Sequence, residues 1–343
     1  MAWSAMPSTH DLRTNLQFRP INWLVHYSHR LRCERFKYVL SVETLAYGAV
    51  RGSSRGIDQT RAVYSPRRLR FSLSHLTLLH HSPPAFIELA AQAGYDFVGL
   101  RVIPLNLPGE PIHPLVSDAR LRRQTKIALR NTGVGVLDVE LARILPDNDV
   151  SRYLPALECA AELGARHVLS SAWCSDRSFV QDQFCALCEL VRPLGLTVDF
   201  EFVTFAAYAT LQHAVDLVRS AACTNAGLAV DTLHFDRSGH RPEELDAVPR
   251  DWFHYAQICD GPFEYSTDES ELKAVAREGR WYVGEGGVGV AQILSHLPDI
   301  PYSIELPNAR RTAILGDELF ARRCLVTARQ CLEGQLQKSR AGW

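Results

Sequence analysis

The chain has 343 residues, of which 46% are hydrophobic and 22% are charged, so it can bury a large core. Its 37 Lys and Arg residues nearly balance 38 Asp and Glu residues, which argues against a binder of nucleic acid or of another polyanion. No apolar run approaches the roughly 18 to 20 residues that cross a bilayer, so we expect no membrane span. Nine cysteines, an odd number, are scattered through apolar segments, a usage typical of reduced thiols in the cytoplasm rather than of a disulfide framework.

The first seventy residues differ in charge from the rest of the chain. They hold 12 basic residues, which are eleven Arg and Lys37, against four acidic ones. They show no sustained period of 2 or 3.6 residues. An Arg-rich and acid-poor segment of this kind is typical of an organellar transit peptide, of a disordered extension, or of upstream sequence attached by a wrongly chosen start. We therefore treat residues 1–69 as a leader and residues 336–343 as a C-terminal tail.

From Phe71 onward, short β-rich segments alternate with longer amphipathic ones. The predicted strands are Phe71–Ser74, Phe97–Arg101, Gly135–Glu140, His167–Ser170, Thr197–Phe202, Gly227–Asp231, Phe253–Cys259 and Tyr302–Glu305. The predicted helices are Pro84–Ala93, Asp118–Asn131, Ser151–Leu163, Ser178–Val191, Leu211–Ala222 and Asp317–Leu332. Eight strand-helix units within residues 70–335 predict a single (β/α)8 TIM barrel. An open, doubly wound sheet is the alternative.

Helix-to-strand turns that contain glycine support this alternation. Glycines precede five of the predicted strands, where a helix C-cap favours a positive φ angle; they are Gly94, Gly133, Gly164, Gly195 and Gly227.

Four consecutive predicted strands end in a carboxylate or a carboxamide. These residues are Glu201, Asp231, Gln257 and Glu305. In a barrel, the carboxyl ends of the strands meet at one mouth, which is where the chemistry of this fold collects. Three negative charges within a few ångströms are unfavourable unless a cation binds or protons are retained.

The sequence resembles the xylose-isomerase-like barrels, a superfamily of sugar phosphate isomerases and epimerases that also contains dehydratases. The resemblance rests on Glu201, Asp231 with His234 three residues later, Gln257 with Asp260 three residues later, the Gly284-Glu285-Gly286 turn and the final Ile304-Glu305-Leu306. It covers about residues 70–335 and implies one divalent metal bound by Glu201, Asp231, Gln257 and Glu305. Many epimerases of this group have His where this chain has Gln257, and the Gln form resembles the dehydroshikimate dehydratase branch.

The predicted ligands are all oxygen donors, which favour Mg²⁺ or Mn²⁺, with Co²⁺ or Zn²⁺ as alternatives. Such a metal would polarise a carbonyl and stabilise an enolate or enediolate. Proton abstraction beside that carbonyl needs a base. Glu201 and Glu305 are the candidate pair, since they could stand on opposite faces of the substrate carbon. His234 is the alternative base.

Five further residues are candidate substrate contacts. Glu140 ends the third strand, His75 follows the first, and Trp173 follows the fourth, where it could form an apolar wall. Arg101 and Arg280 could pair with a substrate carboxylate or phosphate. Arg101 also opens a Pro-rich segment long enough to form a lid.

Two short motifs lack the sequence context of a cofactor or metal site. The glycine-rich run Gly284–Gly289 has no adjoining strand and helix of the kind that form a dinucleotide site. Cys185 and Cys188 lie within one predicted helix and have no second pair. A nuclease of the same superfamily needs additional histidines that this chain lacks.

The predicted function is therefore a metal-dependent isomerase or epimerase of a small ketose or polyol-derived ketone. A hydro-lyase of the 3-dehydroshikimate or inosose type is the first alternative, and a non-catalytic sugar-binding barrel is the second. The expected partner is a small molecule, and a homo-oligomer is compatible with the sequence.

Overall fold

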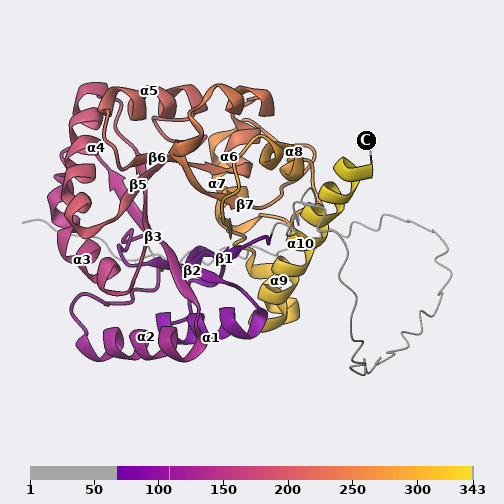
Figure 1. Cartoon of the computed structure of the whole chain (residues 1–343), viewed down its shortest axis with the longest axis horizontal. Coiled ribbons are helices and arrows are strands. Elements are labelled where there is room, and N and C mark those ends of the chain that lie inside the picture. The colour runs from indigo at the N-terminus through magenta and orange to yellow at the C-terminus, as the bar shows by residue number, and fades with distance from the viewer. Residues whose placement is uncertain (1–67, 108, 342–343) are drawn as a thin grey trace, which may run out of the picture. The chain divides into compact units, whose positions relative to one another are not determined.

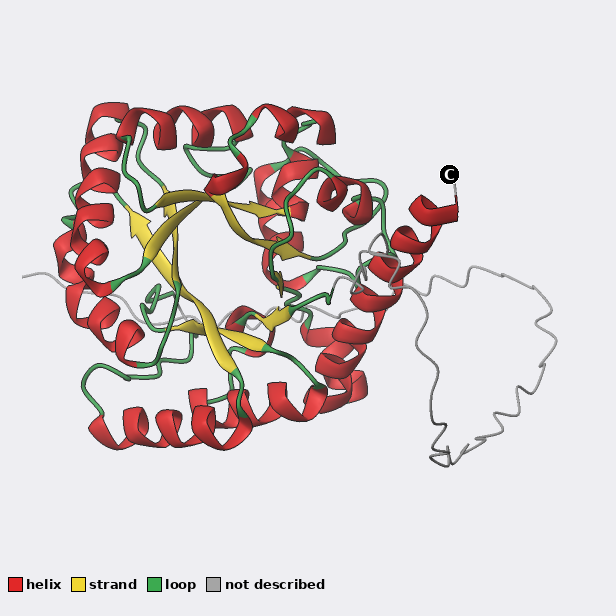
Figure 2. Cartoon of the chain, viewed as in Figure 1, coloured by secondary structure: helices red, strands yellow, loops and turns green. Residues whose placement is uncertain are grey.

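The computed structural model describes residues 68–107 and 109–341. The predicted leader, residues 1–69, lies outside this range except for its last two residues. The described chain forms a closed barrel of eight parallel strands that follow one another in sequence order. Figure 2 shows the strands as a central ring with helices around it. The prediction of a (β/α)8 barrel is confirmed.

The eight strands match the predicted ones to within two residues at every end except the C-terminal end of the third strand, which runs to Ile144 instead of the predicted Glu140. They are β1 (Phe71–Leu73), β2 (Phe97–Arg101), β3 (Gly135–Ile144), β4 (His167–Ala172), β5 (Thr197–Glu201), β6 (Ala226–Asp231), β7 (Phe253–Ile258) and β8 (Tyr302–Ile304).

The helices are α1 (Pro83–Ala93), α2 (Ala119–Thr132), α3 (Leu154–Glu162), α4 (Arg177–Val191), α5 (Leu211–Ala221), α6 (Thr232–Arg237), α7 (Glu269–Glu278), α8 (Val290–Ser295), α9 (Ala309–Leu315) and α10 (Asp317–Ala341). The last helix therefore continues through most of the predicted tail. Short 3₁₀ turns also occur, of which the turn His75–Leu78 matters below. Among the described residues, no helix is both long enough and apolar enough to cross a membrane.

Local sequence explains most helix ends. Asp118, for example, caps α2 by accepting hydrogen bonds from the backbone N–H groups of Arg120 and Leu121. Gly94 ends α1 with a φ of 96°, as its type predicts. Gly227 differs from the prediction, because it lies inside β6, where a Cβ atom would stand 2.7 Å from Asp199 Oδ1. The left-handed position after α5 is instead taken by Ala222.

Most of the apolar core lies between the strands and the surrounding helices. A second, small cluster fills the inside of the barrel with Phe97, Leu137, Leu169, Ala229 and Tyr255. Beside it lies Asp138, which is buried and has no hydrogen-bond partner among the described residues. Burial raises the pKa of this carboxyl well above its usual range, with nearby acidic groups adding to the shift.

The barrel closes where β8 pairs with β1, joining the two ends of the described chain. Thr77 spans this seam, since its hydroxyl donates to the carbonyl of Ile304 at 3.1 Å and accepts from the N–H of Leu306 at 3.0 Å. Helices α1 and α10 lie side by side outside the seam (Figure 1). The first and last strand-helix units are therefore held together in the strand layer by β1 and β8 and in the helix layer by α1 and α10.

Candidate active site

A cavity of about 410 Å³ opens at the carboxyl ends of the strands. Its polar lining comes from six different strands or the connections that follow them, and includes Arg101, Glu140, Glu201, His234, Arg280 and Glu305. The position is the one at which barrels of this class carry their chemistry.

The structure brings the four predicted ligands together at this mouth. Gln257 Nε2 donates to Glu305 Oε1 at 3.0 Å, and one guanidinium joins Asp231 to Glu305. A ligand atom of Glu201 lies within 4.8 Å of one from Asp231. Asp231 also caps α6, because its Oδ1 accepts the backbone N–H of Leu233 at 2.7 Å, which fixes the direction of its other oxygen.

The guanidinium that joins these acids belongs to Arg280, which was predicted as a substrate contact. It is 2% exposed; Nη1 lies 2.5 Å from Asp231 Oδ2 and Nη2 lies 3.0 Å from Glu305 Oε2. Arg280 therefore lines the cavity and also neutralises two predicted ligands. Burial would raise the pKa of Asp231, but Arg280 and His234 together outweigh it and hold that pKa below the usual range.

One acid and one amide oxygen at the mouth remain without a partner. Within the described chain, the carboxyl of Glu201 makes no hydrogen bond or ion pair, and the buried Oε1 of Gln257 makes none either. Burial, followed by the charges of Asp231 and Glu305, raises the pKa of Glu201 well above its usual range. A carboxyl and a carbonyl oxygen that lack partners are groups that a cation would satisfy, so these residues fit a divalent metal.

Ser74 places a single hydroxyl between two carboxyls. Its Oγ lies 2.7 Å from Glu140 Oε1 and 2.9 Å from Glu305 Oε1. A hydroxyl carries only one proton, so both contacts are satisfied only if one carboxyl is protonated. Burial raises the pKa of Glu305 to about 7; Arg280 and Ser74 oppose the shift, whereas Glu140 and Asp231 add to it. Glu305 can therefore hold or release a proton near neutral pH.

His234, the alternative base, also faces this group. One of its ring nitrogens lies within 4.8 Å of ligand atoms of Glu201 and Asp231, and Nδ1 lies 3.1 Å from the hydroxyl of Thr204. Burial lowers the pKa of His234 to about 4, although Asp231 opposes the shift. The imidazole is thus neutral at pH 7, so it can accept a proton or coordinate a metal.

Arg101 and Glu140 form a buried pair under the Pro-rich segment. Nη2 of Arg101 donates to Glu140 Oε2 at 2.9 Å, and Nη1 donates to Glu110 Oε1 at 3.0 Å. Glu110 comes from the predicted lid and, with Leu105 and Leu107, forms one wall of the cavity. The sequence did not single out Glu110, whose position follows only from the fold of that segment.

Of the two remaining predicted substrate contacts, Trp173 lines the cavity and His75 does not. Trp173 lines the cavity as predicted and lies beside Phe205, with 6.0 Å between ring centroids. His75 does not line this cavity: it is fully buried, its Nδ1 accepts the N–H of Arg101 and its Nε2 faces the carbonyl of His81. Backbone contacts occupy both ring nitrogens, so the predicted substrate contact at His75 is wrong.

The two short motifs serve the fold. Asp260 holds the glycine-rich turn by accepting the backbone N–H groups of Gly284 and Val288, each at 3.0 Å. Cys185 and Cys188 lie in α4 as free thiols.

Comparison with known proteins identifies the family. Residues 87–323 match the family described as xylose isomerase-like TIM barrel. The chain belongs to this family. Inosose isomerase of Bacillus subtilis (strain 168) is 23% identical over 167 residues, which are 45% of this xylose isomerase-like chain and 57% of that protein. The matched region thus spans little more than half the length of this curated relative.

Solved structures share the fold of this family member. The IOLI protein with a bound zinc atom superposes with a TM-score of 0.65 at 18% identity, covering 78% of this chain and 99% of that one. D-allulose 3-epimerase from Methylomonas sp., in complex with D-allulose, gives a TM-score of 0.54 at 18% identity, covering 77% and 98%. The 3-keto-D-glucoside 4-epimerase YcjR from E. coli gives 0.55 at 15% identity, covering 77% and 100%.

Proposed function

We propose that this protein is a divalent-metal-dependent isomerase or epimerase of a small ketose or polyol-derived ketone. One observation carries the proposal: Glu201 and Glu305 are both buried at the mouth of the cavity, where burial raises the pKa of Glu305 to about 7 and that of Glu201 well above its usual range. Groups of this kind exchange protons with a substrate near neutral pH. The inosose isomerase and sugar epimerases among its relatives support the same class.

In the proposed mechanism, the two glutamates act on one substrate carbon from different sides. Glu201 ends β5 and Glu305 follows β8, three strands further around the barrel. In its deprotonated form, Glu305 would remove the proton beside the carbonyl, and the C–H electrons would form an enolate. Glu201, in its protonated form, would then protonate the same carbon from the other face. Configuration inverts, and the two carboxyls exchange protonation states.

Glu201, Asp231, Gln257 and Glu305 would hold the metal, which would act as a Lewis acid on the carbonyl and so stabilise the enolate. Their oxygen donors favour Mg²⁺ or Mn²⁺. Arg280 keeps Asp231 and Glu305 in place. Arg101 lines the lid side of the cavity, where its two Nη atoms already pair with Glu140 and Glu110. Trp173 would give the carbon skeleton of the substrate an apolar wall.

A hydro-lyase is the second candidate, because His234 supplies a neutral base beside Glu201 and Asp231. The same enolate could then expel hydroxide from the β-carbon, with protonation of the leaving group giving water.

Metal-loaded protein in D₂O, tested on ketoses, inososes and 3-dehydroshikimate, separates these outcomes. An epimerase incorporates one deuterium into a product of otherwise unchanged composition. A dehydratase gives loss of water and a new ultraviolet chromophore. A protein that binds sugars without deuterium exchange, with or without Mn²⁺, would refute both and favour a non-catalytic barrel.

Matched variants test the assignment of the two glutamates. Glu201→Gln and Glu305→Gln should each abolish epimerisation, whereas Glu158→Gln, at an exposed position of α3, should not. Metal content is measured in parallel, so that loss of the ion is separated from loss of the base. Epimerisation that persists in both cavity variants would contradict the two-carboxyl mechanism.

A further inference from the structure

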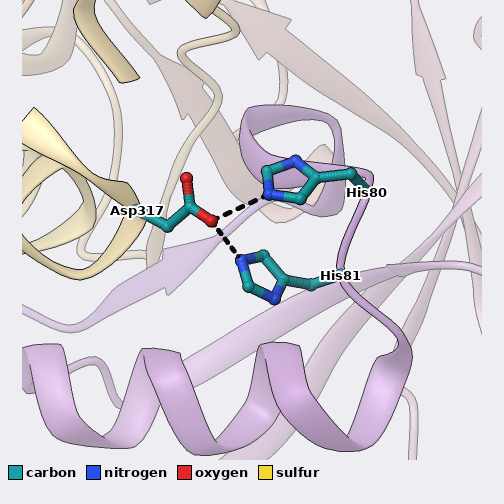
Figure 3. A group of neighbouring side chains, drawn as sticks. All are labelled: His80, His81 and Asp317. Atoms are coloured by element: carbon teal, nitrogen blue, oxygen red, sulfur yellow. Dashed lines mark hydrogen bonds and ion pairs between the residues drawn. The ribbon is translucent and has the colours of Figure 1, made fainter. Parts of the chain in front are cut away.

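A second cluster of metal-ligating side chains lies outside the cavity of the active site. His80 and His81 follow the turn His75–Leu78 after β1, and Asp317 is the first residue of α10. Figure 3 shows both imidazole rings directed at the same oxygen of this carboxylate. His80 Nε2 lies 2.8 Å and His81 Nε2 lies 2.7 Å from Asp317 Oδ2.

We propose that His80, His81 and Asp317 form a second metal site, which takes a borderline transition-metal ion such as Zn²⁺. Two imidazole nitrogens with one carboxylate oxygen match the preferences of Zn²⁺, Ni²⁺ or Cu²⁺ rather than those of Mg²⁺. The candidate active site, by contrast, offers mainly oxygen donors. The two sites should therefore select different ions.

The geometry of the three donors needs only small changes to hold the ion. Their ligand atoms all lie within 4.8 Å of one another. Bonds of about 2.0 to 2.1 Å in a tetrahedral arrangement separate neighbouring donors by about 3.4 Å. The present nitrogen-oxygen distances of 2.8 and 2.7 Å would thus lengthen by about 0.6 Å. The two N–H protons that now face the carboxylate would move to Nδ1 or be released.

The surroundings hold one ligand in place and leave the site accessible. The backbone of His81 is held at both polar groups: its carbonyl faces His75 Nε2 at 3.0 Å, and the N–H of His81 donates to the carbonyl of Leu78 at 3.1 Å. The side chains of His80, His81 and Asp317 are 56%, 24% and 31% exposed. His80 and Asp317 also line a surface cavity of about 640 Å³, from which water could complete the coordination.

The ion would join two parts of the chain that are 236 residues apart in sequence. They are the connection between β1 and α1 and the start of α10, which flank the seam where the barrel closes. An ion that binds only the folded state stabilises it by mass action. We therefore expect Zn²⁺ binding here to raise the melting temperature.

The first test measures Zn²⁺ binding to the chelator-treated full chain by calorimetry. The double variant His80→Asn/His81→Asn should lose one Zn²⁺ equivalent, or bind it at least about 100-fold more weakly, because even indirect partners of a metal contribute 10- to 100-fold. Asp317→Asn, which keeps the shape of the side chain, should have the same effect. His296→Asn is the control, since His296 is a partly buried histidine that pairs with a single carboxylate, Asp246.

Cu²⁺ provides a spectroscopic test that does not depend on activity. Electron paramagnetic resonance should show hyperfine splitting from two imidazole nitrogens, which disappears in the double variant and remains in His296→Asn. Zn²⁺ stoichiometry and a Cu²⁺ spectrum that are both unchanged in the double variant would overturn the proposal. Glu305→Gln, which alters only the active site, should still bind the Zn²⁺ equivalent assigned to His80, His81 and Asp317. The proposal of the second metal site and the proposed function can therefore be refuted independently of each other.

Discussion

His75 is a histidine that the fold holds in its neutral form. Burial lowers its pKa to about 3 from an ordinary 6.5. Burial is the largest cause, and the hydrogen bond from Nε2 to the carbonyl of His81 opposes the shift, while Nδ1 accepts the N–H of Arg101. A second proton, on Nδ1, would point at the Arg101 N–H and would be buried as a charge.

This shift predicts how stability changes with pH. The unfolded chain takes up a proton at His75 below about pH 6.5, whereas the folded chain does so only near pH 3, so acid favours unfolding across this window. Because the pKa of His75 differs between the folded and unfolded chain, the free energy of unfolding falls by about 2 kcal/mol from pH 7 to pH 5. The contribution is fully present above pH 6.5 and decreases as the pH falls.

The assay compares urea denaturation of wild type and His75→Gln at pH 7 and pH 5. Glutamine is neutral throughout, so the stability advantage of wild type should shrink by about 2 kcal/mol at pH 5. His296→Gln, at a partly exposed site, serves as control and should show no comparable change. An advantage that is equal at both pH values would refute the buried, neutral imidazole. Because His75 lies outside the cavity, kcat/KM should change little at pH 7.

Three further predictions concern the mouth of the barrel. Glu305→Gln should weaken Mn²⁺ binding by at least about 10- to 100-fold in a calorimetric titration, and wild-type affinity would contradict the proposed ligand set. His234→Asn should lower turnover by about 10² to 10⁴-fold if His234 is the base of a dehydratase, but mainly raise KM if the two glutamates are the working pair; loss of the metal together with activity would make His234 a ligand and contradict both. Arg101→Met should cost about 3 to 5 kcal/mol in denaturation because it leaves the charge of Glu140 buried without its counter-ion; the cost of Arg101→Met/Glu140→Met should fall short of the sum of the two single-variant costs, and a cost equal to that sum would show that the pair is not coupled.

The strands and the convergence of the site follow from local pattern. Short β-rich segments alternate with amphipathic ones, and a parallel barrel brings the ends of its strands to one mouth. The four predicted ligands could therefore be grouped although β5 and β8 are about a hundred residues apart in sequence. The order of the strands determines where the four residues lie, and the alternation of β-rich and amphipathic segments predicts that order.

The partners of individual charges could not be predicted in the same way. Arg280 follows α7, and nothing in its neighbourhood along the chain indicates that its guanidinium reaches Asp231 and Glu305. Glu110 and Ser74 likewise gain their roles from segments that meet only in the folded protein. Local signals also mislead, as at Gly227, where close approach of the Trp252 carbonyl, His254 and Asp199 rather than a helix end accounts for the glycine.

The closure of the ring has a consequence for how the protein folds and opens. Seven of the eight strand pairs join consecutive strands, and only the pair of β8 with β1 joins the two ends. Each of these two strands has three residues. A contact between residues far apart in sequence forms late, because closing the loop costs conformational entropy before the contact stabilises the chain. The barrel should thus assemble as a curved, open sheet that closes last, and amide hydrogens of β1 and β8 should exchange before those of β4 and β5.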